Sequence, residues 1–410
     1  MARRRDNLCV LGLSAAKTGE PVSDTASAKV SMEDGLITEE ALEQLRGRIG
    51  MRMRIRNVFN ETASRDAIRH FADGVGDPNP LWRDEGYAQK TVYGRIPAPP
   101  SWVFSVFPAW VQQGLRGVAG FHFATDIEFF KPILVDDKIV PECIFAGFDE
   151  KPSRFAGRMI VEHQEGSYFK QGGVLVARSK VSIARVERAA SRSKGKYSQI
   201  QLPHPWQEEQ LQEVEDQVLA EETRGAAPRY WEDVGLGDEL TPVVKGPFGL
   251  TDMIAYCAGA APIELLAHHV ALRKYRAHPA WAFRDPSTLA LEPIYGVHYN
   301  KAAANAMGLA YPYDVGIQRQ CWHIHLLTNW AGDDGWIKRV SAEYRSFVYF
   351  SDVVWLRGKV VEKYVEDGEH CVDIETSAFN QRDENTMPGH ATIALPSKET
   401  GYNPVRTRIG

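Results

Sequence analysis

The chain has 410 residues, enough for two or three domains that each bury a core. Charged residues make up 25% of it and apolar residues 44%, as in globular proteins, and the net charge of −5 argues against nucleic-acid binding. The five cysteines are scattered without a CxxC pair, which argues against a disulfide framework and a zinc site and favours a cytoplasmic protein.

The first residues differ in composition from the rest of the chain. Arg3, Arg4 and Arg5 precede the apolar run LCVLGL, which is too short for a secretory core or a membrane span. We therefore expect no membrane partner. Residues 1–31 are expected to be a disordered extension before a first domain at 32–188.

An internal repeat organises the remaining sequence. Ser64 opens SRDAIRHFADGVG and Thr251 opens TDMIAYCAGA, and each stretch predicts a short helix capped by its first residue. Similar strand-like runs rich in Val, Ile, Phe and Tyr begin at Asp126 and at Ser341. Each half therefore predicts a short helix, a longer apolar helix and a meander of long strands.

Residues 189–228 separate the two halves. They begin with a polar, basic loop and continue into an acidic stretch in which Leu211, Val214, Val218 and Leu219 recur at roughly helical spacing. We expect a linker with one amphipathic helix, a second domain at 229–400 and a tail at 401–410.

A loop motif carries a family resemblance. The segment GDPNPLW from Gly76, followed by Ala88, GRIPAPP and an apolar helix, resembles the MaoC-like (R)-specific enoyl-CoA hydratase/dehydratase family. The family pattern is G-D-x-N-P-aliphatic-His, five residues, then Ala. The resemblance covers most of residues 40–400. It implies an α+β fold of two tandem hotdog domains that form a pseudo-dimer, each a long helix wrapped by an antiparallel β-sheet.

The resemblance also implies a site, and the two copies share its parts unequally. Trp82 occupies the histidine position of the first copy, whereas His298 stands at the same spacing before an alanine in the second, 216 residues later. At that offset Asp77 corresponds to Pro293. Neither copy carries the full pair of aspartate and histidine.

A glycine at the start of the long helix offers its N–H to the thioester oxygen in this family, because a helix start concentrates free donors. The second copy has Gly316 there, while the first has Pro100, which has no N–H. The site is therefore expected in the second copy, with His298 as the base and Gly316 as the donor. Glu292 and Asp314 are candidates for the acid by position only.

The second copy also carries an insertion before its histidine. Ser64 to Trp82 is 18 residues and Thr251 to His298 is 47, which leaves 29 extra residues, approximately 264–292. Their aromatic side chains suit a bulky or ring-bearing acyl group, although the segment could instead cover the sheet or build a subunit contact. The candidate substrate-binding residues are Tyr299, Asn300, Trp281, Phe283, Asp77, Asn79 and Trp82.

These features predict a hydro-lyase acting on an acyl-CoA thioester, without a metal or other cofactor, that could assemble as a homodimer of double hotdogs. Two alternatives are a non-catalytic acyl-CoA or acyl-carrier binding protein and a dehydratase of carrier-bound polyketide intermediates. Ordinary structural roles also compete: Asp77 in a turn, Trp82 and Gly316 in packing, His298 as a core histidine. His323 and His325 lie two positions apart on a predicted helix, so they do not face a common metal.

Overall fold

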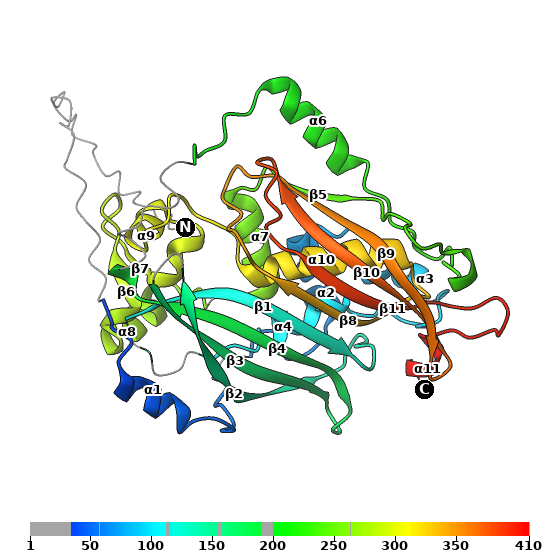
Figure 1. Cartoon of the computed structure of the whole chain (residues 1–410), viewed down its shortest axis with the longest axis horizontal. Helices are drawn as coiled ribbons and strands as arrows, with labels where there is room; N and C mark the ends of the chain where they lie inside the picture. Colours follow the sequence, from blue (N-terminus) through cyan, green and yellow to red (C-terminus); the bar gives the residue numbers. More distant parts are fainter. Residues whose placement is uncertain are drawn as a thin grey trace, which may run out of the picture.

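The computed structural model describes residues 34–409 except 57, 112–114, 116, 154–156, 190–199 and 263. The predicted extension at 1–31 and part of the linker lie outside the described residues. The described part is an α+β structure in which one nine-stranded sheet has the order β2-β3-β4-β1-β8-β11-β10-β9-β5 (Figure 1). A separate two-stranded sheet pairs β6 with β7.

The large sheet reflects the internal repeat, because each half contributes four antiparallel strands in the same order, and the second half adds the short β5 at the edge. The halves join where β1 pairs with β8, with Ile127 opposite Val340. The strands are β1 (Ala119–Phe129), β2 (Ile139–Ser153), β3 (Gly157–Lys170), β4 (Leu175–Val186), β5 (Val243–Lys245), β8 (Trp336–Glu343), β9 (Val354–Glu366), β10 (Glu369–Asn380) and β11 (Gly389–Ala394). The two predicted strand meanders are confirmed, and they form one continuous sheet.

The strands bury alternate side chains because successive residues point to opposite faces. In β9, Val354, Leu356, Gly358 and Val360 are buried, while Arg357 and Lys359 between them are exposed. The apolar face of the sheet packs on the helices and forms a core that runs through both halves.

The short helix of each half is present as α2 (Arg65–Val75) and α7 (Leu250–Ala260). Ser64 caps α2 as predicted, since its side chain accepts a hydrogen bond from the N–H of Ala67. The prediction that Thr251 caps the second helix is wrong: the cap is Gly249, and the Asp252 carboxylate accepts from the Gly249 N–H at 2.7 Å.

The long apolar helix exists only once among the described residues. In the second half, α10 (Gly316–Ala331) is buried along almost its whole length and contacts β8, β9 and also β1 of the first half. In the first half the chain makes only η2 (Pro100–Trp102) and α4 (Val103–Val106) before turning extended at Phe107. The expected first long helix is therefore wrong. Pro108 explains its early end, because proline has no N–H to continue the helical ladder.

The connecting segments complete the architecture. The predicted amphipathic linker helix is α6 (Glu208–Leu219), whose Val214 packs against Val244 and Val353. The insertion folds as α8 (His268–Ala277), η4 (Pro279–Trp281) and the hairpin β6 (Ala282–Arg284) to β7 (Leu291–Pro293). The other elements are α1 (Glu39–Arg46), η1 (Pro80–Trp82), α3 (Glu85–Ala88), η3 (Trp231–Asp233), η5 (Ile294–His298), α9 (Lys301–Ala306) and α11 (Arg406–Ile409).

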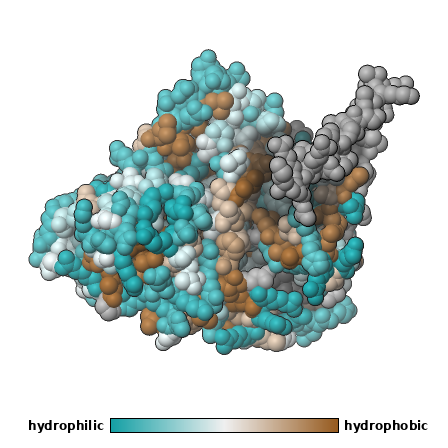
Figure 2. Space-filling view, turned by 180° about the vertical axis from the view of Figure 1, so that it is seen from behind, coloured by the Kyte–Doolittle hydropathy of each residue, from teal (hydrophilic) through white to brown (hydrophobic). Residues whose placement is uncertain are grey.

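The surface is largely hydrophilic, and on the face seen in Figure 2 the apolar residues gather in separate patches, one of them a band down the middle. Several large apolar side chains of the insertion are exposed, among them Val270 at 57% and Leu289 at 66%. Within the described residues, no helix has the length and apolar character needed to span a bilayer.

Two glycines allow α2 of the first half and α7 of the second half to pack closely where they cross. A Cβ on Gly74 would lie 2.6 Å from the carbonyl oxygen of Ala255, and one on Gly259 would lie 2.4 Å from that of His70. Each helix thus presents a glycine to the backbone of the other. The two positions are equivalent, because each is the tenth residue of its helix.

Gly74→Ala and Gly259→Ala are each expected to destabilise the protein by at least about 1–3 kcal/mol, because backbone atoms cannot move aside as side chains can. Gly47→Ala is the matched control, since its Cβ would meet nothing closer than 3.6 Å at φ −63°. Urea denaturation would measure all three free energies of unfolding. Equal stability of the Gly74→Ala and Gly47→Ala variants would contradict the close crossing.

Candidate active site

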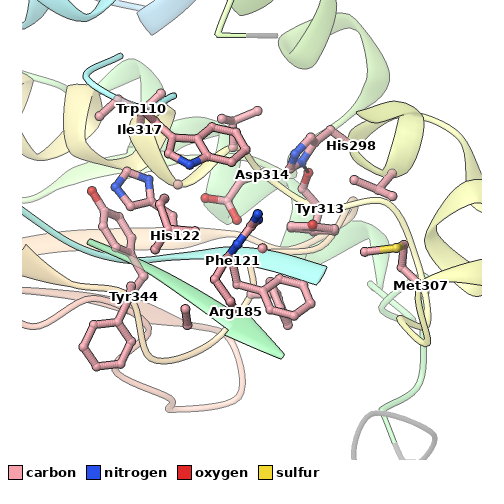
Figure 3. Close-up of a pocket in the computed structure, with 18 of the residues that line it drawn as sticks. Trp110, Phe121, His122, Arg185, His298, Met307, Tyr313, Asp314, Ile317 and Tyr344 are labelled. Atoms are coloured by element: carbon pink, nitrogen blue, oxygen red, sulfur yellow. Dashed lines mark hydrogen bonds between the residues drawn. The ribbon is translucent and has the colours of Figure 1, made fainter. Parts of the chain in front are cut away.

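A cavity of about 320 Å³ lies between the two halves (Figure 3). One wall is the loop that carries His298, together with the start of α10. The other wall comes from β1 and β4 of the first half, and the segment 344–347 after β8 completes it. Both copies of the repeat therefore build this one cavity.

His298 lines the cavity with a defined tautomer. Its Nδ1 lies 3.0 Å from the carbonyl oxygen of Tyr313. A carbonyl only accepts, so Nδ1 carries the proton and Nε2 keeps a free lone pair in the neutral ring. Burial lowers the pKa of His298, against smaller raising effects of the Tyr313 carbonyl and the nearby Asp314. The imidazole is therefore held neutral, as a general base must be.

The start of α10 faces the same cavity without a side-chain cap. Gly316 is its first residue, and the first N–H groups of a helix have no partner within the helix. These free donors and the positive end of the helix dipole favour an oxygen that gains negative charge.

Asp314 lines the cavity but is held by Arg319. The guanidinium donates from Nε and Nη2 to the two carboxylate oxygens, both at 2.9 Å, and both residues are buried. The carboxylate also accepts from the N–H of Val348, and Arg319 donates to the carbonyls of Ser346 and Thr386. This clamp fixes the start of α10 to the loop after β8.

The other candidates of the second copy lie around the cavity rather than in its lining. Asn300 caps α9 by accepting from the N–H of Ala303, and its amide donates to Asp285 at 2.5 Å. Glu292 lies in β7. Burial raises the pKa of Tyr275 and of Tyr299, and the charge of Glu292 raises both further.

The two aromatic candidates of the insertion also lie outside the lining. Trp281 is 37% exposed and stacks on His278 with the ring centroids 4.2 Å apart. Phe283 is buried in a cluster with Val297 and Met307, next to the loop of His298. The insertion thus supports the histidine loop from outside.

In the first copy the equivalent cavity holds only about 50 Å³ and is lined by Asn79, Trp82 and Pro100, among others. Trp82 is 4% exposed, and its indole N–H donates to Asp77 Oδ2 at 2.8 Å. Asn79 accepts from the N–H of Leu81 as the cap of η1. These three candidates thus lie together, apart from His298.

Asp77 meets a different histidine. His325 of α10 lies 3.6 Å from Asp77 Oδ1 and 2.8 Å from Glu221 of the linker. His323 instead bonds Thr376 at 2.6 Å, so these two histidines face different partners as predicted. Among the described residues, no group of three or more His, Cys, Asp or Glu side chains could hold a metal ion.

Several cavity residues were not expected from the sequence, and His122 of β1 is the one of these that carries an imidazole. His122 lines the cavity (Figure 3) and lies against Gly316. Alignment of the repeat places Ile337 at the equivalent position of β8, because Asp126 aligns with Ser341. The available signal was that one strand has a histidine at a position where the similar strand of the other copy has an isoleucine.

Comparisons with known proteins agree with this architecture. Residues 49–179 match the model of the FAS1-like dehydratase domain region. UPF0336 proteins of Streptomyces avermitilis and Thermobifida fusca are 45% and 47% identical over 42 and 38 residues, 10% and 9% of this chain. These matches span only 28% and 25% of the relatives' own lengths.

Solved structures match over most of the chain. A MaoC-like dehydratase covers 86% of this chain and 100% of its own, with a TM-score of 0.60 and 16% identity. A putative MaoC domain protein dehydratase from Chloroflexus aurantiacus covers 86% and 96%, with a TM-score of 0.53 and 13% identity. A Mycobacterium tuberculosis protein with a double hotdog fold covers 85% and 96%, with a TM-score of 0.51 and 11% identity. The predicted double hotdog fold is confirmed.

Asp314→Ala should destabilise the protein by about 3–5 kcal/mol, because it leaves the buried charge of Arg319 without its partner. Asp126→Ala, which breaks a partly exposed ion pair with Arg339 across β1 and β8, should cost under about 1 kcal/mol. Thermal and urea unfolding of both variants would measure the difference. A stable Asp314→Ala protein would show that the clamp does not fix the site.

Proposed function

We propose that this chain, which has the double hotdog fold of MaoC-like dehydratases and contains a FAS1-like dehydratase region, is a hydro-lyase that adds water to an enoyl thioester or removes it from a 3-hydroxyacyl thioester. One observation carries the proposal. A neutral histidine with a free Nε2 and an uncapped helix start line the same cavity.

In the hydration direction, His298 Nε2 takes a proton from water as the oxygen bonds to the β-carbon. The π electrons move through the α-carbon to the thioester oxygen, which becomes an enolate oxygen beside the N–H of Gly316. The proton on Nε2 then passes to the α-carbon, the carbonyl reforms, and one water has been added. Dehydration is the reverse.

One base therefore serves both proton transfers in this proposal. The position of the family's aspartate is Pro293, and Asp314 is engaged by Arg319 on both carboxylate oxygens. Glu292 lies outside the cavity lining. His298, by contrast, has a second ring nitrogen, Nε2, outside its bond to Tyr313, and this nitrogen can take up and return one proton.

The cavity lining supports a bulky or ring-bearing acyl group. Trp110 meets Tyr295 edge-on at 6.3 Å, and Phe347 meets Phe121 at 5.4 Å and Tyr313 at 4.7 Å. Such rings supply large apolar contact area. Arg188 also lines the cavity, as does Arg345, which forms an exposed ion pair with Glu343. Their positive charge favours an anionic carrier of the acyl group, which we propose to be coenzyme A.

A homodimer of double hotdogs is a further part of this proposal. The exposed apolar side chains of the insertion would be covered in such an assembly. Light scattering across a range of protein concentrations would test it, and a mass of one chain throughout would exclude it.

A panel of enoyl-CoA and 3-hydroxyacyl-CoA thioesters, from crotonyl to long-chain and aromatic acyl groups, would test the reaction. Gain or loss of the absorbance of the conjugated double bond is the measurement. Binding of these thioesters without turnover would instead indicate a non-catalytic binding protein, and turnover only on carrier-protein substrates would indicate the polyketide alternative.

His298→Ala should lower kcat at least about 100-fold, because a positioned general base contributes on the order of 10² to 10⁴. His298→Asn should be equally inactive while keeping a donor to the Tyr313 carbonyl, and His278→Ala, outside the cavity lining, should be fully active. Equal activity of His298→Ala and wild type would remove His298 from the reaction.

The pH profile gives an independent check. A base must be neutral, and burial lowers the pKa of His298, so activity should persist as pH falls until that lowered pKa is reached. The acidic limb of kcat/KM should therefore lie below about 6.5, the ordinary value for histidine. A limb at or above that value would contradict the assignment.

A further inference from the structure

His122 reaches the cavity from the first half of the chain. It lies in β1, the strand that joins the two meanders, and its side chain is only partly exposed. Figure 3 shows His122 and His298 on either side of Asp314. The first copy thus places an imidazole at a cavity whose other polar groups belong mainly to the second copy.

The ring lies directly against the start of α10. A Cβ on Gly316 would meet His122 Cβ at 2.6 Å, Nδ1 at 2.7 Å and Cγ at 2.9 Å. Glycine is therefore the residue that lets β1 and α10 approach this closely. A Cβ lies about 2.5 Å from its own nitrogen, so Nδ1 lies within about 5 Å of the Gly316 nitrogen. Two donors at that separation can both reach one oxygen at ordinary hydrogen-bond lengths.

The other ring nitrogen is engaged by a chain of hydroxyl groups. His122 Nε2 lies 2.8 Å from Thr125 Oγ1, and the Tyr344 hydroxyl lies 3.2 Å from the same Thr125 oxygen. The Tyr344 hydroxyl also lies 3.1 Å from Gln320 Oε1, which only accepts. With the Tyr344 proton in that bond, the Thr125 hydroxyl can donate to His122 Nε2, and the ring proton then lies on Nδ1. The Tyr344 ring, with its centroid 4.3 Å from that of His122, fixes the orientation of the imidazole.

The surroundings keep this imidazole uncharged. Burial and the positive charge of Arg319 lower the pKa of His122 to about 3, against a smaller raising effect of the Ala124 backbone. A neutral imidazole with its proton on Nδ1 is a hydrogen-bond donor at every pH at which His298 can act as a base.

The repeat supplies an independent comparison. At the nearly closed cavity of the first copy, Trp82 replaces the histidine base and Pro100 replaces the glycine donor. The residue equivalent to His122 there is Ile337, which lines that cavity. The base, the helix donor and the strand imidazole are therefore present together at the open cavity and missing together at the closed one.

We propose that His122 is a catalytic residue whose Nδ1–H, together with the N–H of Gly316, binds the thioester oxygen and stabilises its negative charge in the transition state. This inference rests on the proposed function. It gives the first half of the chain a direct part in the reaction, because neither half alone supplies both donors.

Two substitutions of His122 distinguish the contributions of its two ring nitrogens. His122→Asn retains a donor near the position of Nδ1, whereas His122→Gln retains a polar group near Nε2 and loses the donor toward the cavity. His122→Gln should lower kcat about 10²- to 10³-fold, as loss of such donors does elsewhere. His122→Asn should stay within about tenfold of wild type, and dissociation constants for butyryl-CoA should change less than about threefold in both.

The infrared carbonyl band of a bound thioester reports how strongly its oxygen is hydrogen-bonded. In the infrared difference spectrum of bound crotonyl-CoA labelled with ¹³C at its carbonyl, the carbonyl band should lie at lower wavenumber in wild type and His122→Asn than in His122→Gln. Thr125→Val, which removes the hydroxyl at Nε2, should lower kcat about tenfold with unchanged binding, and it keeps the test informative if His122→Gln does not fold.

The possible results distinguish the role of His122 from the hydro-lyase assignment on which it rests. An active wild type with unchanged kcat and carbonyl band in His122→Gln, or an unchanged kcat in Thr125→Val, overturns the role of His122 and leaves the hydro-lyase assignment intact. A wild type without turnover on any thioester overturns both. Loss of turnover in His122→Gln with rescue in His122→Asn supports the proposal.

Discussion

The antiparallel pairing of β1 with β8 is the constraint on which the rest of the structure depends. It turns two four-stranded meanders into one sheet and places a strand of the first half beside α10 of the second. In this register Asp126 lies opposite Ser341. A shift by one residue would turn the side chains of β1 away from the start of α10. The cavity is thus a consequence of how the halves join.

Within the part of the chain that the structure describes, a long buried helix in the second half has no counterpart in the first, and this difference breaks the symmetry of the fold. The first half ends its helix early at Phe107, before Pro108, and α10 is left to contact strands of both halves. The space equivalent to the cavity is filled from the inside by Trp82, which bonds Asp77. A large buried indole with a satisfied N–H is a stable replacement for a solvated pocket. The two copies therefore differ in the space that they leave open, about 320 Å³ at one cavity and about 50 Å³ at the other.

The parts of the fold that are set by local chemistry could be predicted from the sequence. The spacing that relates Trp82 to His298 also relates Asp84 to Asn300, and these two residues cap α3 and α9 in the same way. This equivalence supports the alignment of the loops. It also shows that Asn300, which was expected to bind substrate, caps a helix, an ordinary role for an asparagine at that position.

Long-range pairing could not be predicted in the same way. Asp314 looks like a free acid near a helix start, but its partner Arg319 is five residues along α10 and its further contacts come from the loop after β8. His122 has no local motif, because its place at the cavity depends on contact with a glycine 194 residues later, from 122 to 316. Such contacts are set by how strands pair, which a local pattern does not encode.

Asp77 of the first copy belongs to a buried network of charged residues. Asp77 lies near His325, which bonds Glu221, and Lys245 pairs with Glu221 at 3.6 Å while donating to the Gly76 carbonyl at 2.8 Å. Burial raises the pKa of Glu221, but His325 and Lys245 outweigh it and lower the pKa to about 2. Glu221 is therefore ionised at neutral pH, and its partners tie the linker, the first loop and α10 into one buried network. Because α10 also begins at Gly316, the helix that this network anchors is the one whose start faces the cavity, so residues of the first loop and the linker help to hold that helix in position.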